Sequence, residues 1–223
     1  MTKILIHACN DRLWYVNDYL IPSMIEQGID RGQIEVWLDK DGKGCLGSWI
    51  ASCEYLKDKP GGTWHLQDDV LIAHDFKEKI EKYNDGIVCG FCHDLYETEG
   101  LHHLGKVLAF HMWQSSFPCI RIPNKVLKHF LEWWHDKAKN DKEYKRYVDS
   151  NKHDDTLFRL FMVKERSTDT AYNLAPHLVE HVDYLIGGSQ ANKWRGYAAM
   201  GAYFYDDYLV DELIQKLAKR RTR

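Results

Sequence analysis

The chain has 223 residues, of which 44% are hydrophobic and 28% charged, and its formal net charge is -3. This length and composition are typical of one globular domain with a sizeable core. The small negative charge excludes the strong positive field that drives non-specific nucleic-acid binding. The first residues lack the apolar core and cleavage site of a signal peptide, and no apolar run is long enough to span a membrane. We therefore expect a cytoplasmic protein without a membrane span.

The first third of the chain alternates predicted strands and helices. Apolar runs predict strands over residues 3–7, 34–38 and 63–67, and apolar residues at helical spacing predict helices over 13–25 and 48–56. Asp11 is the expected cap of the first helix, and Pro22 is expected to kink or restart it. Two βαβ units in succession make a parallel sheet, with ligand sites beyond the carboxyl ends of its strands.

The pattern after Phe76 is mixed. Strands are predicted over residues 87–90, 117–122 and 172–174, and amphipathic helices begin near Asn124 and Asp154. The basic tail, 219–223, is expected to be a solvated helix end rather than a binding patch. The chain as a whole therefore predicts an α/β fold.

Six cysteines are scattered along the chain, and a cytoplasmic protein keeps such residues reduced. Cys89 and Cys92, followed by His93, have the spacing of a haem attachment site, and with His102 and His103 they also suggest zinc or redox chemistry. The alternative is that Cys89 lies in a buried strand as a small hydrophobic residue, and this is the interpretation we favour.

Polar residues follow each of the first predicted strands: Asn10-Asp11, Asp39 and Asp41, and Asp68-Asp69. Adjacent carboxylates repel each other and cost free energy unless a positive group lies near them. Asp68-Asp69 is therefore either a solvated acidic turn or a metal site at the end of a buried strand.

These residues carry a family resemblance. Asn10-Asp11-Arg12, Asp39 and the stretches HLQDDVL, HDDTLF and PHLVEHV, in that order, resemble the GT-A type of nucleotide-diphospho-sugar transferases, above all short bacterial and phage-encoded glycosyltransferase-like proteins. The resemblance covers Lys3 to about Ser189. It implies one GT-A-like (Rossmann-like) domain over residues 1–223, with a mixed, mainly parallel central sheet flanked by helices. Residues 1–76 would form the nucleotide-binding half, 77–190 the acceptor and metal half, and 191–223 a C-terminal helical tail.

In this family an acidic DxD motif ends a central strand, and a divalent metal joins it to the diphosphate of the donor. The resemblance implies Asp69 as a metal ligand and His181 as another, with Mn²⁺ or Mg²⁺ as the ion. Asp68 is expected to contact a ribose or a bound water. Gln67 occupies the first position of the motif, so one possible carboxylate ligand is missing, and Gln67 is expected to bind a ribose hydroxyl.

The expected catalytic base is Asp154, with Asp155 as the second choice, because an acid at a helix start beside the acceptor has this role in inverting members of the family. Both residues also suit a helix N-terminus through the helix dipole alone. The expected donor-binding residues are His7, Asn10, Asp11, Arg12, Asp39, Gly44, Ser48, Gln67 and Asp68. Trp113 to Ser116 are expected to line the acceptor or sugar side.

The sequence therefore predicts a metal-dependent glycosyltransferase that moves a sugar from a nucleotide diphosphate donor to an acceptor hydroxyl. The acceptor is left open between a glycan, a protein side chain and a modified DNA base. A non-catalytic nucleotide-sugar-binding protein on the same fold is one alternative. A nucleotidyltransferase is another, although HACNDRLW lacks the glycine- and lysine-rich phosphate loop that usually follows the first strand of such enzymes.

Overall fold

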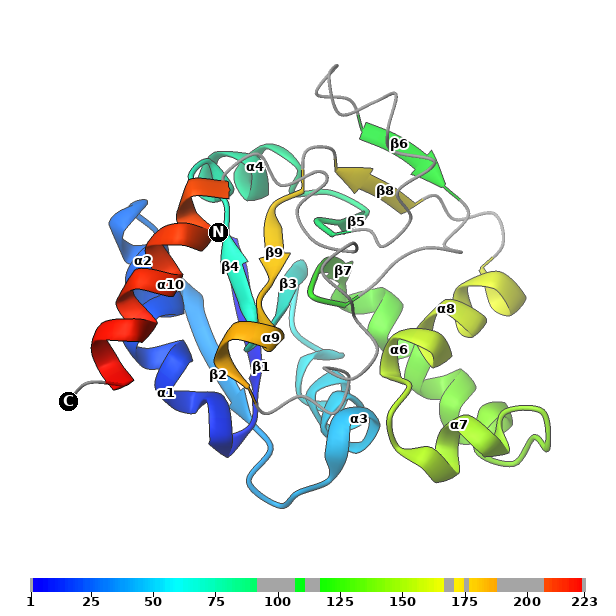
Figure 1. The fold of residues 1–223 in the computed structure, drawn as a ribbon. Coiled ribbons are helices and arrows are strands. Elements are labelled where there is room, and N and C mark those ends of the chain that lie inside the picture. Colours follow the sequence, from blue (N-terminus) through cyan, green and yellow to red (C-terminus); the bar gives the residue numbers. More distant parts are fainter. Residues whose placement is uncertain are drawn as a thin grey trace.

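The computed structural model describes residues 2–91, 107–110, 117–166, 171–174, 177–187 and 207–221. These residues contain a seven-stranded sheet with the strand order β2-β1-β3-β7-β5-β8-β6 (Figure 1). Its strands are β1 (Lys3–Ala8), β2 (Ile34–Leu38), β3 (Gly62–Gln67), β5 (Ile87–Cys89), β6 (Val107–Phe110), β7 (Cys119–Pro123) and β8 (Ala171–Leu174). Strands β1, β2, β3, β5 and β8 point one way, and β6 and β7 point the other. The predicted fold class, an α/β domain with a mixed, mainly parallel sheet, is confirmed.

The two predicted βαβ units form three neighbouring parallel strands, and β1 lies between β2 and β3. Ile4 of β1 lies opposite Ile34 of β2 on one side and opposite Trp64 of β3 on the other, and both pairings are parallel. Ile4, Leu5 and Ile6 are at most 1% exposed, because helices cover both faces of the sheet and every side chain of a central parallel strand must then be apolar. The three strands end at the same edge of the sheet, which places the polar residues that follow them on one side of the molecule.

The first helical segment changes its hydrogen-bonding pattern along its length. It begins with η1 (Asn10–Arg12) and α1 (Leu13–Tyr15), widens to a π-helical turn in η2 (Val16–Leu20) and continues as α2 (Ile21–Glu26). Pro22 lies in the first turn of α2, directly after the wide turn. Proline has no backbone N–H to donate to the preceding turn, which fits its place where the α-helical pattern restarts. The predicted cap is wrong: Asp11 lies inside the η1 turn, and Cys9 is the capping residue.

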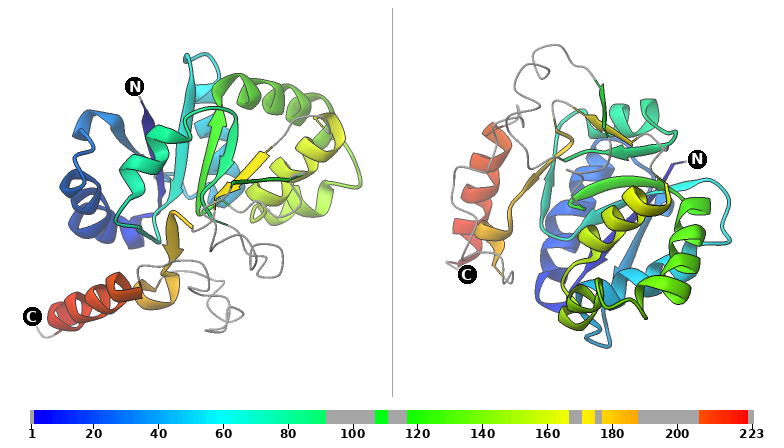
Figure 2. Two further views of the ribbon diagram at one scale, coloured as in Figure 1. Left: turned by 90° about the horizontal axis from the view of Figure 1, so that it is seen from above. Right: turned by 90° about the vertical axis from the view of Figure 1, so that its right-hand side faces the viewer.

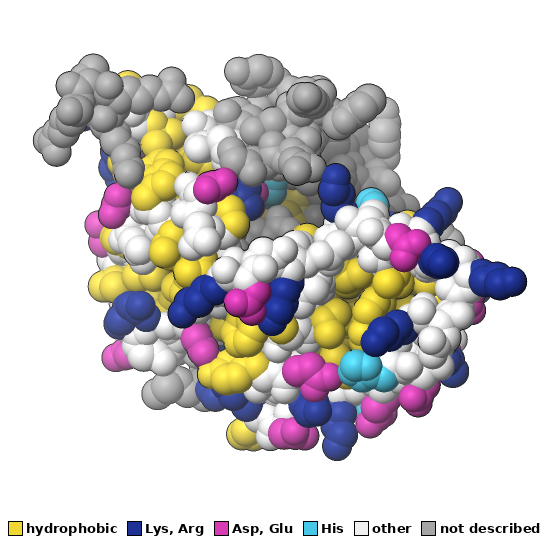
Figure 3. Space-filling view, turned by 90° about the horizontal axis from the view of Figure 1, so that it is seen from below, with side chains coloured by type: hydrophobic (Ala, Val, Ile, Leu, Met, Phe, Trp, Pro, Cys, Tyr) yellow, Lys and Arg dark blue, Asp and Glu magenta, His cyan; other side chains and the backbone are white. Residues whose placement is uncertain are grey.

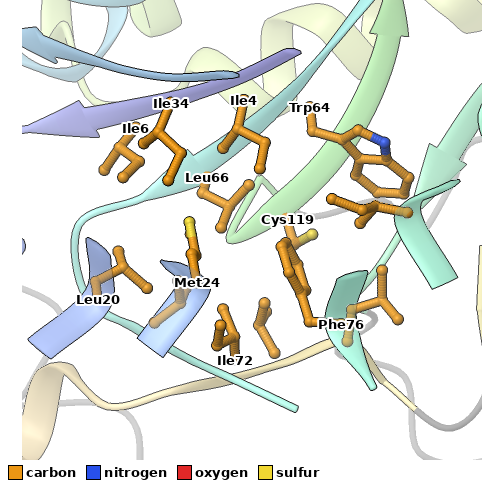
Figure 4. Close-up of a cluster of buried hydrophobic side chains, with 14 of the residues drawn as sticks. Ile4, Ile6, Leu20, Met24, Ile34, Trp64, Leu66, Ile72, Phe76 and Cys119 are labelled. Carbon is orange, nitrogen blue, oxygen red and sulfur yellow. The ribbon is translucent and has the colours of Figure 1, made fainter. Parts of the chain in front are cut away.

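Two hydrophobic clusters hold the helices against the sheet. One cluster lies between the sheet and α1, α2, α4 (Phe76–Lys82) and α10 (Asp207–Arg221), and Figure 4 shows part of it around Ile4, Leu66, Met24 and Phe76. The other cluster joins the opposite face to α3 (Gly44–Leu56), α6 (Asn124–Trp133) and α8 (Asp154–Glu165). Figure 2 shows these helix layers on the two sides of the sheet. The domain therefore has three layers, with the sheet in the middle.

A small second sheet pairs segments that are far apart in the sequence. Strand β4 (Val70–Ile72) follows the acidic residues directly, and it pairs antiparallel with β9 (Val179–His181), with Val70 opposite His181. Helix α9 (Asp183–Ile186) begins two residues after His181. Figure 1 shows β9 beside β4, with α9 directly after the end of β9. This pairing is what brings the C-terminal part of the chain to Asp69.

The remaining described elements are η3 (Arg31–Gln33), η5 (Trp134–Ala138), which continues α6, and α7 (Lys145–Ser150). Basic and acidic side chains are interspersed on the face that Figure 3 shows, in keeping with the small net charge. Among the described residues, no helix is both long and apolar enough to cross a membrane.

Candidate functional site

The two adjacent carboxylates at the end of β3 are held by one arginine. Arg12 in η1 directs Nη2 to Asp68 Oδ1 at 2.7 Å and Nη1 to Asp69 Oδ2 at 2.6 Å. The backbone N–H of Cys9 donates to the other oxygen of Asp68 at 2.7 Å. The Asp68 and Asp69 side chains are only 2% and 5% exposed. Asp68 and Asp69, which we call the acidic step, are therefore part of a buried ion-pair network. The guanidinium of Arg12, in the turn after β1, relieves the repulsion between their two charges.

The second oxygen of the Asp69 carboxylate, Oδ1, faces His181 instead of Arg12. This oxygen lies 3.2 Å from His181 Nε2, and His181 Nδ1 lies 3.1 Å from Asp183 Oδ1. Asp69 Oδ1 is buried, and its contact among the described residues is this one with His181. Asp69, His181 and Asp183 each offer one ligand atom within 4.8 Å of the others. This buried cluster could hold a metal ion.

The charges around the acidic step shift its pKa values in opposite directions. Burial raises the pKa of Asp68 to about 6, although Arg12 opposes the shift. Burial also acts to raise the pKa of Asp69, but His181 and Arg12 outweigh it and the pKa is lowered. Burial next to Asp69 raises the pKa of Tyr15, whose hydroxyl donates to the carbonyl oxygen of Val70 at 3.0 Å. Asp69 is thus kept ionised, as a metal ligand must be.

His7 points to the face of the sheet that α3 covers. His7 Nε2 and His65 Nδ1 share a hydrogen bond of 3.0 Å, and both rings pack against Trp49 of α3. Burial lowers the pKa of His7 to about 4, and it lowers the pKa of His65 as well. Both imidazoles are therefore neutral at pH 7. His7 is part of a packed aromatic group, with its ring nitrogen Nε2 already engaged.

The loop after β2 uses its polar groups to begin α3. Asp39 accepts hydrogen bonds from the backbone N–H groups of Lys43 and Gly44, both at 2.9 Å. Gly44 has a φ of 71°, and a Cβ atom on it would lie 2.7 Å from Asn151 Nδ2. Glycine is needed there for both reasons. The amide of Gly44, an expected donor-binding residue, is therefore already bonded to Asp39, and Ser48, one turn later, is buried.

The two candidate bases stand in the first turn of α8. Asp154 is 8% exposed and lies beside Cys45 at the start of α3. Burial, with a further contribution from Asp155, raises the pKa of Asp154 to about 6. Asp155 is partly exposed and accepts from the backbone N–H of Thr156 at 2.6 Å. Asp154 thus holds its proton to a higher pH than an ordinary aspartate, and Asp155 accepts a hydrogen bond within the first turn of α8.

The other predicted donor-side residues lie at the same edge of the sheet. Asn10 and Asp11 are exposed in η1. Gln67 is partly buried at the end of β3, and its backbone N–H donates to the carbonyl oxygen of Pro118 at 3.1 Å. The structure thus brings Asp68, Asp69, Arg12 and His181 together, while Asp39, Gly44 and Asp154 form a separate set of contacts around the start of α3.

Several residues that the sequence analysis singled out lie outside the part of the chain that the structure describes. Cys89 is buried in β5, as the favoured interpretation predicted. Cys92, His93, His102 and His103 lie outside the described residues, as do Trp113 to Ser116. Asp183 is the site residue that the sequence analysis missed. In the sequence it is only an acidic residue two positions after His181. This spacing is common, so the role of Asp183 becomes visible only through its contact with His181 in the structure.

The chain matches no protein-family model and no curated protein sequence. It is similar to the solved structure of HddC from Yersinia pseudotuberculosis, with 12% identity, a TM-score of 0.31, and coverage of 58% of this chain and 80% of that chain. The same protein complexed with GMP-PN gives 12% identity and a TM-score of 0.31 over 57% and 79%. The galactosyltransferase LgtC in complex with donor and acceptor sugar analogs gives 12% identity and a TM-score of 0.41 over 77% and 73%. These TM-scores are below 0.5, so the functional argument rests on the site geometry.

Proposed function

We propose that the protein is a metal-dependent glycosyltransferase that transfers a sugar from a nucleotide diphosphate donor to an acceptor hydroxyl. The observation that carries this proposal is the buried Asp69–His181–Asp183 cluster at the edge where the parallel strands end. Ligands of α/β sheets bind beyond this edge. Under the proposal, residues 1–76 form the donor half, and residues 77–190 contribute His181 and the acceptor side.

The charge of the cluster suits a divalent cation. Asp68, Asp69 and Asp183 are carboxylates, and Arg12 is the cation that pairs with the first two. When His181 gives up its proton to bind a metal, three carboxylates and one guanidinium leave two net negative charges in a buried region. Oxygen ligands with one imidazole suit Mn²⁺, and Mg²⁺ also accepts the carboxylates. Asp69 and His181 are the residues that would hold the ion.

A bound divalent cation supplies Lewis-acid stabilisation for a diphosphate leaving group. The residues of this chain then have separable proposed roles. Arg12 fixes the orientation of the Asp69 carboxylate, so that Oδ2 pairs with Arg12 and Oδ1 faces His181. Asn10 and Asp11 are exposed beside the cluster and can contact the nucleotide. Both oxygens of Asp68 already have partners, so we propose that Asp68 acts through Arg12 rather than by binding ribose directly.

Asp154 is the proposed base that takes the proton from the acceptor hydroxyl. Its raised pKa of about 6 supports this role, because a general base works best with a pKa near the operating pH. Such a base accelerates the reaction by about 10²–10⁴-fold. Asp155 is the second choice, because its carboxylate already accepts the Thr156 N–H.

Calorimetric titration of UDP, GDP and CDP, in EDTA and in Mn²⁺, tests the metal site. We expect nucleotide binding that needs the metal, and its loss in Asp69→Asn and His181→Ala. Glu180→Gln is the matched control, because it removes another buried carboxylate from the same strand. Equal affinity in EDTA and in Mn²⁺ would overturn the metal dependence.

Release of sugar from UDP-glucose, UDP-galactose and GDP-mannose then distinguishes an enzyme from a binding protein. We expect turnover in the wild-type protein and a loss of about 10²–10⁴-fold in Asp154→Asn, with unchanged UDP affinity. If UDP binds with metal but no donor is turned over with any glycan, peptide or DNA acceptor, the non-catalytic alternative is correct.

A further inference from the structure

The two ring nitrogens of His181 face two different carboxylates. Nε2 lies 3.2 Å from Asp69 Oδ1, and Nδ1 lies 3.1 Å from Asp183 Oδ1. The side chains of His181 and Asp183 are 7% and 2% exposed. Because Nδ1 and Nε2 point to different sides of the imidazole, Asp69 and Asp183 hold the ring from different edges.

The backbone fixes this arrangement. Strand β9 pairs with β4 so that His181 lies opposite Val70, and the N–H of Val182 donates to the carbonyl oxygen of Asp69 at 2.8 Å. Asp183 is the first residue of α9, and its carbonyl oxygen accepts from Gly187 N–H at 2.9 Å. Asp69 and Asp183 therefore sit on separate backbone segments whose positions relative to the ring are set by hydrogen bonds.

A histidine that binds a metal must present an unprotonated nitrogen to it. In a neutral imidazole the other nitrogen carries the proton, and the group that accepts this proton's hydrogen bond decides which nitrogen is available. We propose that Asp183 is a positioning residue for the metal site: it accepts a hydrogen bond from His181 Nδ1–H and so leaves Nε2 to face the cation beside Asp69. This inference rests on the proposed metal-dependent function.

The alternative role for Asp183 is that of a third metal ligand, since its carboxylate lies within 4.8 Å of the other two ligand atoms. The contact geometry favours positioning, because the short contact of Asp183 is to Nδ1, whereas Asp69 lies at Nε2. A cation bound by Asp69 and Nε2 would have the carboxylate of Asp183 on the other nitrogen. The two roles make different demands on the residue: a ligand needs the negative charge, whereas a positioning residue needs only an acceptor oxygen.

Asp183→Asn and Asp183→Ala separate these roles. Asparagine has the shape of aspartate and keeps an oxygen that accepts from Nδ1–H, but it lacks the charge. Alanine removes the acceptor. The affinity for Mn²⁺ alone is measured by calorimetry for both variants, for Asp69→Asn and His181→Ala, and for the control Glu180→Gln. Thermal unfolding in EDTA verifies that each variant is folded. Long-range ¹H–¹⁵N spectra of histidine-labelled protein with Zn²⁺, a diamagnetic substitute, report which nitrogen of His181 carries the proton.

We expect Asp183→Ala to weaken Mn²⁺ binding by about 10–100-fold, and Asp183→Asn to stay within about threefold of the wild type. The spectra should show Nδ1 protonated and Nε2 metal-bound in the wild type and in Asp183→Asn, but not in Asp183→Ala. Equal losses in Asp183→Asn and Asp183→Ala would overturn the proposal in favour of a ligand role, and wild-type affinity in Asp183→Ala would overturn it as well. If Asp69→Asn and His181→Ala also bind Mn²⁺ like the wild type, these residues do not form the metal site. That result would overturn the proposed metal-dependent function, and it is distinct from a failure of the role proposed for Asp183.

Discussion

Replacing Arg12 with methionine removes the cation between Asp68 and Asp69 and keeps much of the side-chain stem. In the wild-type protein the guanidinium makes one ion pair of 2.7 Å and one of 2.6 Å, with carboxylates that are 2% and 5% exposed. The variant would leave two neighbouring charges buried without a counter-ion on that side. We therefore expect a large loss of stability when no metal is present.

The expected magnitude follows from the burial of the pair. Removing one partner of a buried ion pair costs about 3–5 kcal/mol, because the remaining charge is left uncompensated. An exposed arginine contributes much less to the free energy of unfolding. The control is therefore Arg31→Met, because Arg31 is exposed and donates a hydrogen bond to the Ile34 carbonyl oxygen. We expect that control to change the free energy of unfolding by less than about 1 kcal/mol. Adding Asp68→Asn to Arg12→Met should recover part of the loss, because only one of the two facing charges then remains.

Urea unfolding at pH 7 in EDTA measures these differences, and a second series with Mn²⁺ tests the link to the metal site. A ligand that binds only the folded state stabilises it by about 2.7 kcal/mol at a concentration of 100 times its Kd, so Mn²⁺ should restore part of the stability of Arg12→Met. If Arg12→Met in EDTA unfolds within about 1 kcal/mol of the wild type, Arg12 is not the group that relieves the repulsion, and the description of the acidic step as a buried network is wrong.

The other predictions concern pH and packing. The pKa of Asp154 is about 6 instead of its ordinary 3.8, so between roughly pH 4 and pH 6 the folded protein holds a proton that the unfolded chain has released. The free energy of unfolding should therefore fall by about 3 kcal/mol from this group as the pH rises through that window, and Asp154→Asn should remove this contribution and stabilise the protein at pH 7. Urea titrations at pH 4 and pH 7 measure it, and an unchanged difference between the two pH values in Asp154→Asn would contradict it. Ile6→Ala, at a 0% exposed position in β1, should lower the free energy of unfolding by about 2–5 kcal/mol. Ile25→Ala, at a 45% exposed position, should lower it by less than about 0.5 kcal/mol. Similar losses for the two variants in urea unfolding would be inconsistent with the core described above.

Local patterns were sufficient to predict most of the elements. The strand β2 has the predicted bounds. Strand β1 extends one residue beyond its prediction, and its apolar run could be recognised because a parallel strand that is buried on both faces is rich in apolar residues. The helix α3 begins at Gly44 rather than Ser48, because Asp39 and Asn151 satisfy the groups at its start through contacts that are not visible in the local sequence. The edge of the sheet at which the polar residues gather could also be predicted, since parallel strands end together.

The composition of the site depended on contacts between distant parts of the chain. Asp69 and His181 were predicted as partners from the family resemblance, and the pairing of β4 with β9 is what places them 3.2 Å apart. The sequence posed the question of what neutralises Asp68 and Asp69, but it could not show that Arg12 is the neutralising group, because a charge is free to pair with any opposite charge that the fold brings near it. Asp183 entered the site in the same way. Hydrophobic periodicity is a property of neighbours along the chain, whereas buried charges are stabilised by neighbours in space, and only the tertiary structure decides which residues those are.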